Sequence, residues 1–230
     1  MAIASTFQRL HRSLVNSAGT IVFGMEDGTV SIFGLIFGVA ATTSETKTVL
    51  IAGASGAVAA AVSMMAGAYL DVETTRDAIA ANRALVQADG AQAMASLGER
   101  LKKAGLTKQQ SAALSGAVQH DRAALGGLLL ALQGASDSSL NPWEQALWML
   151  LADFLAAAVP ILPFVFAPIP QARIISATVT IALLVALGIG RARIAKRSVV
   201  RTIAETVSIG IAAALAGVVI GVLINRGFGG

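Results

Sequence analysis

Five long apolar runs, separated by shorter polar segments, dominate the pattern along this chain. They cover residues 20–41, 49–70, 146–166, 174–190 and 206–224. Each run reaches the roughly 17 to 25 residues that an α-helix needs to cross about 30 Å of hydrocarbon. A helix also satisfies its own backbone hydrogen bonds in lipid. The pattern therefore predicts an all-α, polytopic membrane protein with five transmembrane helices.

The composition agrees with a chain that is embedded in a lipid bilayer. Of the 230 residues, 55% are hydrophobic and 13% are charged, and the mean hydropathy is +0.72, which is too apolar for an ordinary soluble domain. The first 19 residues lack the apolar core and cleavage site of a signal peptide, so the first helix should be retained. Cysteine is absent, so any metal ligands should be carboxylate, thioether, imidazole, hydroxyl or carbonyl groups.

A polar segment at 71–141 divides the chain into three parts, with membrane helices at 1–70 and 142–230. Apolar positions from Val72 to Val86 recur among polar residues and predict an amphipathic helix that continues out of the second run. Thr107 and Gln110 form a capping-box pattern, which predicts a helix from there through Leu132. We expect a small helical cytosolic domain between the second and third membrane helices.

The distribution of positive charge predicts the orientation in the membrane. Fourteen of the 17 Lys and Arg residues lie in the N-terminus, in 71–145 and in 191–201, whereas Lys47, Arg173 and Arg226 lie in the alternate connections. By the positive-inside rule, the N-terminus and the middle segment should be cytoplasmic and the C-terminus should lie on the opposite side. The basic segment 191–201 fits anionic lipid headgroups, and we expect no nucleic-acid partner.

The first apolar run contains a carboxylate, Asp27, which follows a second one at Glu26. A charge in hydrocarbon costs roughly 2.5 to 3.5 kcal/mol on insertion scales, so such residues are usually functional. Asp27 is therefore a candidate transport residue, with an interfacial or helix-capping carboxylate as the alternative. Ser31, Gly34 and Gly38 share its helical face, a small-residue stripe that would also serve close helix packing alone.

The second apolar run contains Ser63 and Met64 on its own small-residue face. A carboxylate that faces a thioether is a plausible port for a transition-metal ion, so these two residues join Asp27 and Glu26 as candidate ligands. Packing filler is the alternative for Met64, because methionine often fills gaps between apolar side chains. Met65 points about 100° away and is assigned to packing.

Four further acids are weaker candidates. Asp153 and Glu205, in or near the third and fifth runs, are candidates for proton coupling. Glu205 follows Arg201 by four residues, so an ion pair is the alternative, and Asp153 would otherwise be a buried, hydrogen-bonded acid. Glu73 and Asp77 share a helical face as a metal pair would, although a solvated surface is the safer interpretation. No catalytic arrangement or phosphate-binding loop is present, so we expect no enzyme.

Several segments together carry a resemblance to a known family. They are Asp-Gly at 27–28, Ser-Ile-Phe-Gly at 31–34, Ala-Val-Ser-Met-Met-Ala-Gly-Ala-Tyr-Leu at 61–70, Asn-Pro-Trp at 141–143, Ala-Val-Pro-Ile-Leu-Pro-Phe at 158–164, Gly-Ile-Gly-Arg-Ala-Arg at 188–193, Gly-Ile-Ala-Ala-Ala at 210–214 and Gly221. This combination covers nearly the whole chain and resembles the vacuolar iron transporter family.

The resemblance implies a five-span homodimer that exchanges cytosolic divalent metal, chiefly ferrous iron and often manganese, for protons. The path would run between the protomers along the first two spans, with Asp27 as the translocation carboxylate and Met64 as a thioether ligand. The metal would be the transported substrate, with no permanently bound cofactor.

The chain departs from the family pattern in its middle segment. The family typically reads Gly-Glu-Tyr where this chain has Gly67, Ala68 and Tyr69, and the family's glutamate-rich helix is reduced here to Glu73 and Asp77. The metal-collecting site should therefore be degenerate. The preferred interpretation is a proton-coupled efflux carrier for ferrous or manganous ion in a bacterial-type inner membrane. The alternatives are a non-transporting scaffold or sensor, and a carrier of another solute.

Overall fold

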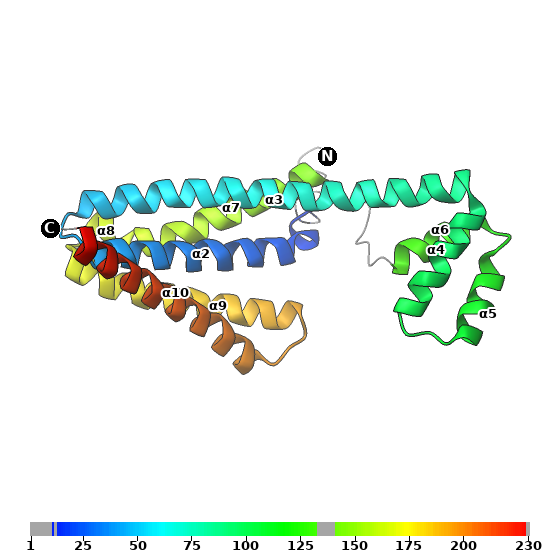
Figure 1. The fold of residues 1–230 in the computed structure, drawn as a ribbon. Coiled ribbons are helices and arrows are strands. Elements are labelled where there is room, and N and C mark those ends of the chain that lie inside the picture. The colour runs from blue at the N-terminus through cyan, green and yellow to red at the C-terminus, as the bar shows by residue number, and fades with distance from the viewer. Residues whose placement is uncertain (1–10, 12, 133–140, 229–230) are drawn as a thin grey trace, which may run out of the picture. The chain divides into compact units, whose positions relative to one another are not determined.

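A computed structural model describes residues 11, 13–132 and 141–228, and the regular structure in this part of the chain is helical. Five helices are long and apolar enough to cross a membrane (Figure 1). They are α2 (Ala18–Ala40), α3 (Thr46–Ala88), α7 (Pro142–Ile161), α9 (Ile169–Ile194) and α10 (Val199–Phe228). The predicted all-α membrane fold with five spanning helices is thus confirmed.

The described chain divides into two compact units. Residues up to Tyr69 and from Trp143 onward form the membrane-helix unit, and Leu70–Pro142 form the small helical unit. The boundary falls inside α3, which runs on without a break from the second apolar run, as the amphipathic pattern after residue 70 predicted.

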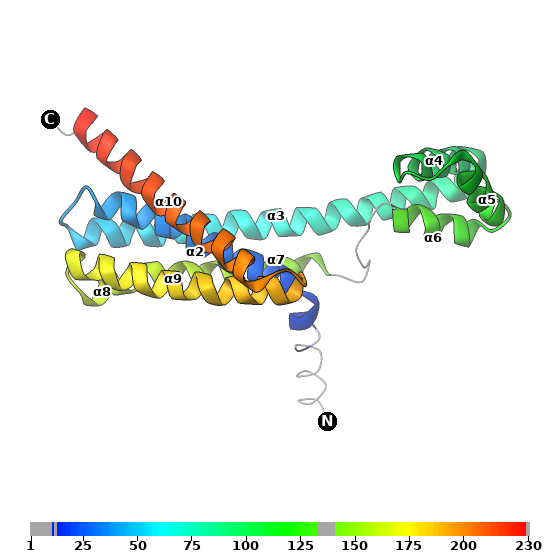
Figure 2. The same cartoon turned by 90° about the horizontal axis from the view of Figure 1, so that it is seen from below.

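Glycine contacts fix the relative directions of the helices around α2. Gly24 packs against Met149 and Gly28 packs against Asp153, so α2 and α7 advance together and run parallel. The turns at 41–45 and 167–168 reverse the chain between α2 and α3 and before α9 (Figure 2). The turn at 167–168 thus makes α9 return antiparallel to α7.

Helix α10 also runs parallel to α2 and crosses it closely (Figure 2). A Cβ atom at Gly34 would lie 2.9 Å from the carbonyl oxygen of Ala213, and one at Gly38 would lie 2.7 Å from that of Gly217. From α10, a Cβ atom at Gly217 would clash with the carbonyl oxygen of Gly34. Gly34 and Gly38 of the small-residue stripe are thus used for close helix packing, and their partner is α10.

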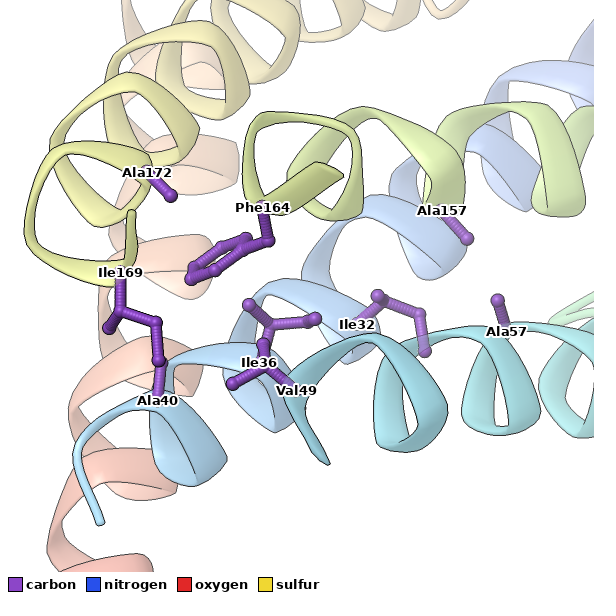
Figure 3. Close-up of a cluster of buried hydrophobic side chains, with 9 residues drawn as sticks. All are labelled: Ile32, Ile36, Ala40, Val49, Ala57, Ala157, Phe164, Ile169 and Ala172. Atoms are coloured by element: carbon purple, nitrogen blue, oxygen red, sulfur yellow. The ribbon is translucent and has the colours of Figure 1, made fainter. Parts of the chain in front are cut away.

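A buried apolar cluster joins the two helices of the first hairpin to α7, α8 and α9 (Figure 3). Its members are Ile32, Ile36, Ala40, Val49, Ala57, Ala157, Phe164, Ile169 and Ala172. Phe164 lies on α8 (Pro163–Phe166), a separate short helix. The prediction of one unbroken span through 166 is therefore wrong, because the chain turns after Ile161 and Pro163 starts a new helix.

The small helical unit contains α4 (Gly90–Lys103), α5 (Lys108–Val118) and α6 (Arg122–Leu132) around a buried core of its own. The capping box of Thr107 and Gln110 is confirmed at the start of α5. The prediction of a single helix through Leu132 is wrong, because the Asp121 side chain accepts hydrogen bonds from the Ala123 and Ala124 amides and caps a new helix.

Candidate functional site

A cavity of about 390 Å³ lies beside α2, between that helix, the C-terminal end of α9 and the N-terminal part of α10. Three of its lining residues are charged: Glu26 and Asp27 from α2, and Arg191 from α9. The other seven lining residues are apolar: Gly19, Val22, Phe23, Val30, Ile194, Ala195 and Ile209. Two acids and one base therefore face a small, otherwise apolar space within the membrane-helix unit.

Helix packing explains where this cavity lies. The close crossing of α2 and α10 is centred on Gly34 and Gly38, and Asp27 lies seven residues before Gly34, about 10 Å along the helix. Here α10 presents Ile209 and α9 presents Ile194 to the cavity, in place of the backbone contacts made at the glycines. The small residues bring the two helices together, and the larger ones leave a space beside the acids.

Glu26 is held by two other helices. Its Oε1 accepts a hydrogen bond from Nη1 of Arg191 at 3.0 Å and another from Oγ1 of Thr206 at 2.9 Å. The same Nη1 lies 3.4 Å from Oε2. The Glu26 side chain is only 13% exposed, so this partly buried cluster ties α2 to α9 and α10 beside the cavity.

Asp27 is half-buried, and no hydrogen bond or ion pair of its carboxylate is found among the described residues. It is the tenth residue of α2, whose N-cap is Ser17. The helix-capping explanation for Asp27 is therefore wrong, because the carboxylate lies well inside the helix. In the described chain, a cation that balanced the charge of Asp27 would have to lie in the cavity beside it.

Asp153 of α7 packs against the same turn of α2, at Gly28. It is fully buried on α7, and neither carboxylate oxygen has a hydrogen-bond partner in the part of the chain that the structure describes. A Cβ atom at Gly28 would lie 2.9 Å from its Oδ1, and the carboxylate is close enough to Asp27 to interact electrostatically. The alternative of a buried, hydrogen-bonded acid is therefore wrong, whereas proton coupling stays a prediction.

Met64 and Ser63 lie on α3 and do not line this cavity. Gly53 of α3 packs against Ile36 and Gly56 packs against Leu35. These contacts show that α3 runs antiparallel to α2. By the same register, Met64 lies at the level of residues 25–27 of α2. Met64 is half-buried and Ser63 is exposed. The predicted thioether therefore shares the depth of Asp27 but lies outside the cavity.

The remaining predicted acids do not line this cavity. Glu73 and Asp77 belong to the small helical unit, where Glu73 lies 4.0 Å from Arg76 and Asp77 is exposed, as on a solvated surface. Glu205 pairs with Arg197 at 3.2 Å and with Arg201 at 3.1 Å. The expected ion pair of Glu205 is confirmed. Among the described residues, no group of three or more His, Cys, Asp or Glu side chains could hold a metal ion.

Two residues that bond Glu26 were not predicted from the sequence. Arg191 was assigned to the basic segment that follows the fourth span, but it lies in the last turn of α9 and contacts Glu26. Thr206 gave no signal, since a threonine near the start of an apolar run is common. Both contacts join residues more than 160 positions apart, so no local pattern could have indicated them.

Five membrane-length helices, two of which carry an acid within their apolar stretch (Asp27 in α2 and Asp153 in α7), define a polytopic membrane protein. A family model described as the VIT family matches residues 18–222, which is most of the chain. The chain belongs to this family, the vacuolar iron transporters, which are membrane transporters of divalent metal ions. Comparison with curated proteins gave no match. The family predicted from the sequence is thus confirmed.

Proposed function

We propose that this protein carries divalent transition metal, ferrous iron or manganese, out of the cytoplasm in exchange for protons. The observation that supports this most directly is the Asp27 carboxylate. It lies within a membrane-length helix, is unpaired within the described chain and borders the cavity. A divalent cation and a proton compete for the same carboxylate oxygens. Alternating occupancy of Asp27 would therefore couple the two fluxes.

The chemistry of the nearby groups suits the proposed ions. Carboxylate oxygen binds hard and borderline divalent cations, and a thioether adds a preference for Fe²⁺ over Mg²⁺ or Ca²⁺. Met64 lies at the depth of Asp27 but outside the cavity of a single chain, so the thioether would act only if the path extended to that side of α3. Met64 and Ser63 therefore stay candidates.

A homodimer would give this path its second wall. Phe23, Ser31 and Leu35 are exposed on α2 along the same stripe as half-buried Asp27. A carboxylate and a hydroxyl on one lipid-facing stripe would be costly, and a second copy of the chain would remove both from lipid. We therefore propose that the stripe faces a partner subunit, with the small helical unit on the cytoplasmic side.

The proposal is tested by Asp27→Asn in proteoliposomes. Because asparagine keeps the shape of the side chain but loses the charge, metal-dependent proton movement should fall at least about tenfold, while the oligomeric state stays unchanged. Asp71→Asn, at an exposed position of α3, is the matched control and should keep wild-type flux. Full activity in the Asp27 variant would remove this carboxylate from the mechanism.

The alternative function is a non-transporting membrane scaffold or sensor. It is favoured by the small helical unit, which has its own apolar core but, among its described residues, no group of three or more His, Cys, Asp or Glu side chains that could hold a metal ion. Vesicles that contain the wild-type protein separate the two functions. An absence of Fe²⁺ or Mn²⁺ flux under an imposed proton gradient would support the scaffold and contradict the carrier.

A further inference from the structure

The cavity beside α2 already contains a cation, the guanidinium group of Arg191. We propose that Arg191 is a tethered cation that occupies the Glu26 half of a two-carboxylate site, and that an incoming divalent metal ion displaces it. This inference rests on the proposed metal-transport function and extends it to two residues, Glu26 and Arg191, that the cavity brings together with Asp27. In this scheme the Asp27 carboxylate is available to the metal ion before Arg191 is displaced.

One carboxylate oxygen of Glu26 is held only weakly, as a metal ligand would need. Its Oε1 is occupied by Arg191 and Thr206, but Oε2 has only the longer 3.4 Å contact with Arg191. Although neighbouring residues of a helix point about 100° apart, both Glu26 and Asp27 line the cavity. An ion in the cavity could therefore approach carboxylate oxygens from two successive residues.

Arg191 is placed so that it can move away. It lies in the last turn of α9, and its side chain is 38% exposed, so the guanidinium could reach solvent without unfolding of the helix. The cavity of about 390 Å³ exceeds the roughly 180 Å³ that six water molecules occupy in the liquid. It is therefore large enough for a divalent ion that keeps part of its hydration shell.

The charges explain what such an arrangement would do. While Arg191 neutralises Glu26, the cavity carries the net charge of one carboxylate, and displacement of Arg191 leaves two. The number of charged ligands tunes the affinity of oxygen sites for divalent cations. Arg191 should therefore weaken metal binding and assist release. Arg197 and Arg201, which follow α9 in the chain, already pair with Glu205 and would not replace it.

The test is Mn²⁺ binding to the full-length protein in detergent, measured by the electron paramagnetic resonance signal of free Mn²⁺. Arg191→Gln should lower the Kd by about tenfold, because it unmasks Glu26. Arg191→Lys keeps the charge but loses the planar fork, so it should lower the Kd by about threefold. Arg193→Gln, an exposed position in the same turn of α9, is the control and should leave the Kd unchanged.

The double variant Glu26→Gln with Arg191→Gln decides whether Glu26 is the ligand. Its Kd should return to the wild-type value, because the carboxylate that the arginine masked is gone. If the gain in affinity persists in the double variant, Arg191 acts only by repelling the ion, and the proposal is wrong. Unchanged affinity in Arg191→Lys would also overturn it, even if Arg191→Gln failed to fold.

Asp27→Asn in the same assay separates this inference from the proposed function. If Asp27→Asn weakens Mn²⁺ binding but the Arg191 variants bind like wild type, the tethered cation is wrong and the transport function stands. If wild type neither binds Mn²⁺ through Asp27 nor transports it, the proposed function itself fails.

Discussion

Two carboxylates lie at the same turn of α2, and their environments differ. Asp27 borders the cavity, whereas Asp153 reaches the turn from α7 and is fully buried against Gly28. A buried polar group without a hydrogen bond lowers the free energy of unfolding by about 1 to 3 kcal/mol. A side chain that destabilises the fold and is still present within a membrane helix is best explained by a functional role.

Asp153→Asn tests this explanation. Asparagine has nearly the same shape and carries no charge, so the melting temperature of the protein in detergent should not fall. Metal-driven proton flux should fall at least about tenfold if Asp153 takes part in proton coupling. Glu144→Gln, an exposed acid in the first turn of the same helix, should change neither quantity. A lower melting temperature with normal flux would make Asp153 a structural residue.

At this scale the sequence indicated Asp27 and Glu26 as candidates but not what surrounds them. Asp27 was recognisable because a carboxylate inside a run of twenty apolar residues is rare. Its neighbour Glu26 was grouped with it as a ligand, but the structure places that carboxylate against Arg191, 165 residues away. The contact depends on how α9 returns beside α2, which only the tertiary fold determines.

The crossing of α2 and α10 is the contact between elements that positions the cavity. Gly217→Val should disrupt it, because even a Cβ atom at this position would clash with the backbone of Gly34. Overpacking of a close contact typically lowers the free energy of unfolding by about 1 to 3 kcal/mol, so the melting temperature should fall by several degrees. Gly227→Val on the same helix has open space within 4 Å and is the control. Equal melting temperatures would show that the crossing is loose.

At the scale of helices, the sequence patterns predicted which helices exist better than where each helix ends or which helix it contacts. The stripe of Gly34 and Gly38 predicted a close helix approach, but nothing local indicates α10 as the partner. The division of α5 from α6 did have a signal, since Asp121 is a favourable N-cap residue, but the apolar periodicity appeared continuous across it. A capping residue in a periodic pattern therefore decides where a helix ends.

For the molecule as a whole, the two ends of the membrane-helix unit differ in charge. The end formed by the start of α2 and the turn between α9 and α10 has the exposed basic residues Arg193, Lys196, Arg197 and Arg201. The opposite end has Lys47, Arg173 and Arg226. The other predicted N-terminal charges, Arg9 and Arg12, lie outside the described residues. This asymmetry supports the proposal that the α9–α10 turn faces the cytoplasm.

Labelling of single cysteines tests this orientation directly, because the chain contains no cysteine of its own. Ser44 and Ser198 are exposed in turns at opposite ends of the membrane-helix unit. In intact cells, a membrane-impermeant maleimide should label Ser44→Cys fully and leave Ser198→Cys unlabelled until the membrane is permeabilised. The opposite pattern would turn the cavity at Asp27 and Arg191 toward the outside. Because that cavity lies near the basic end, efflux from the cytoplasm requires the first pattern.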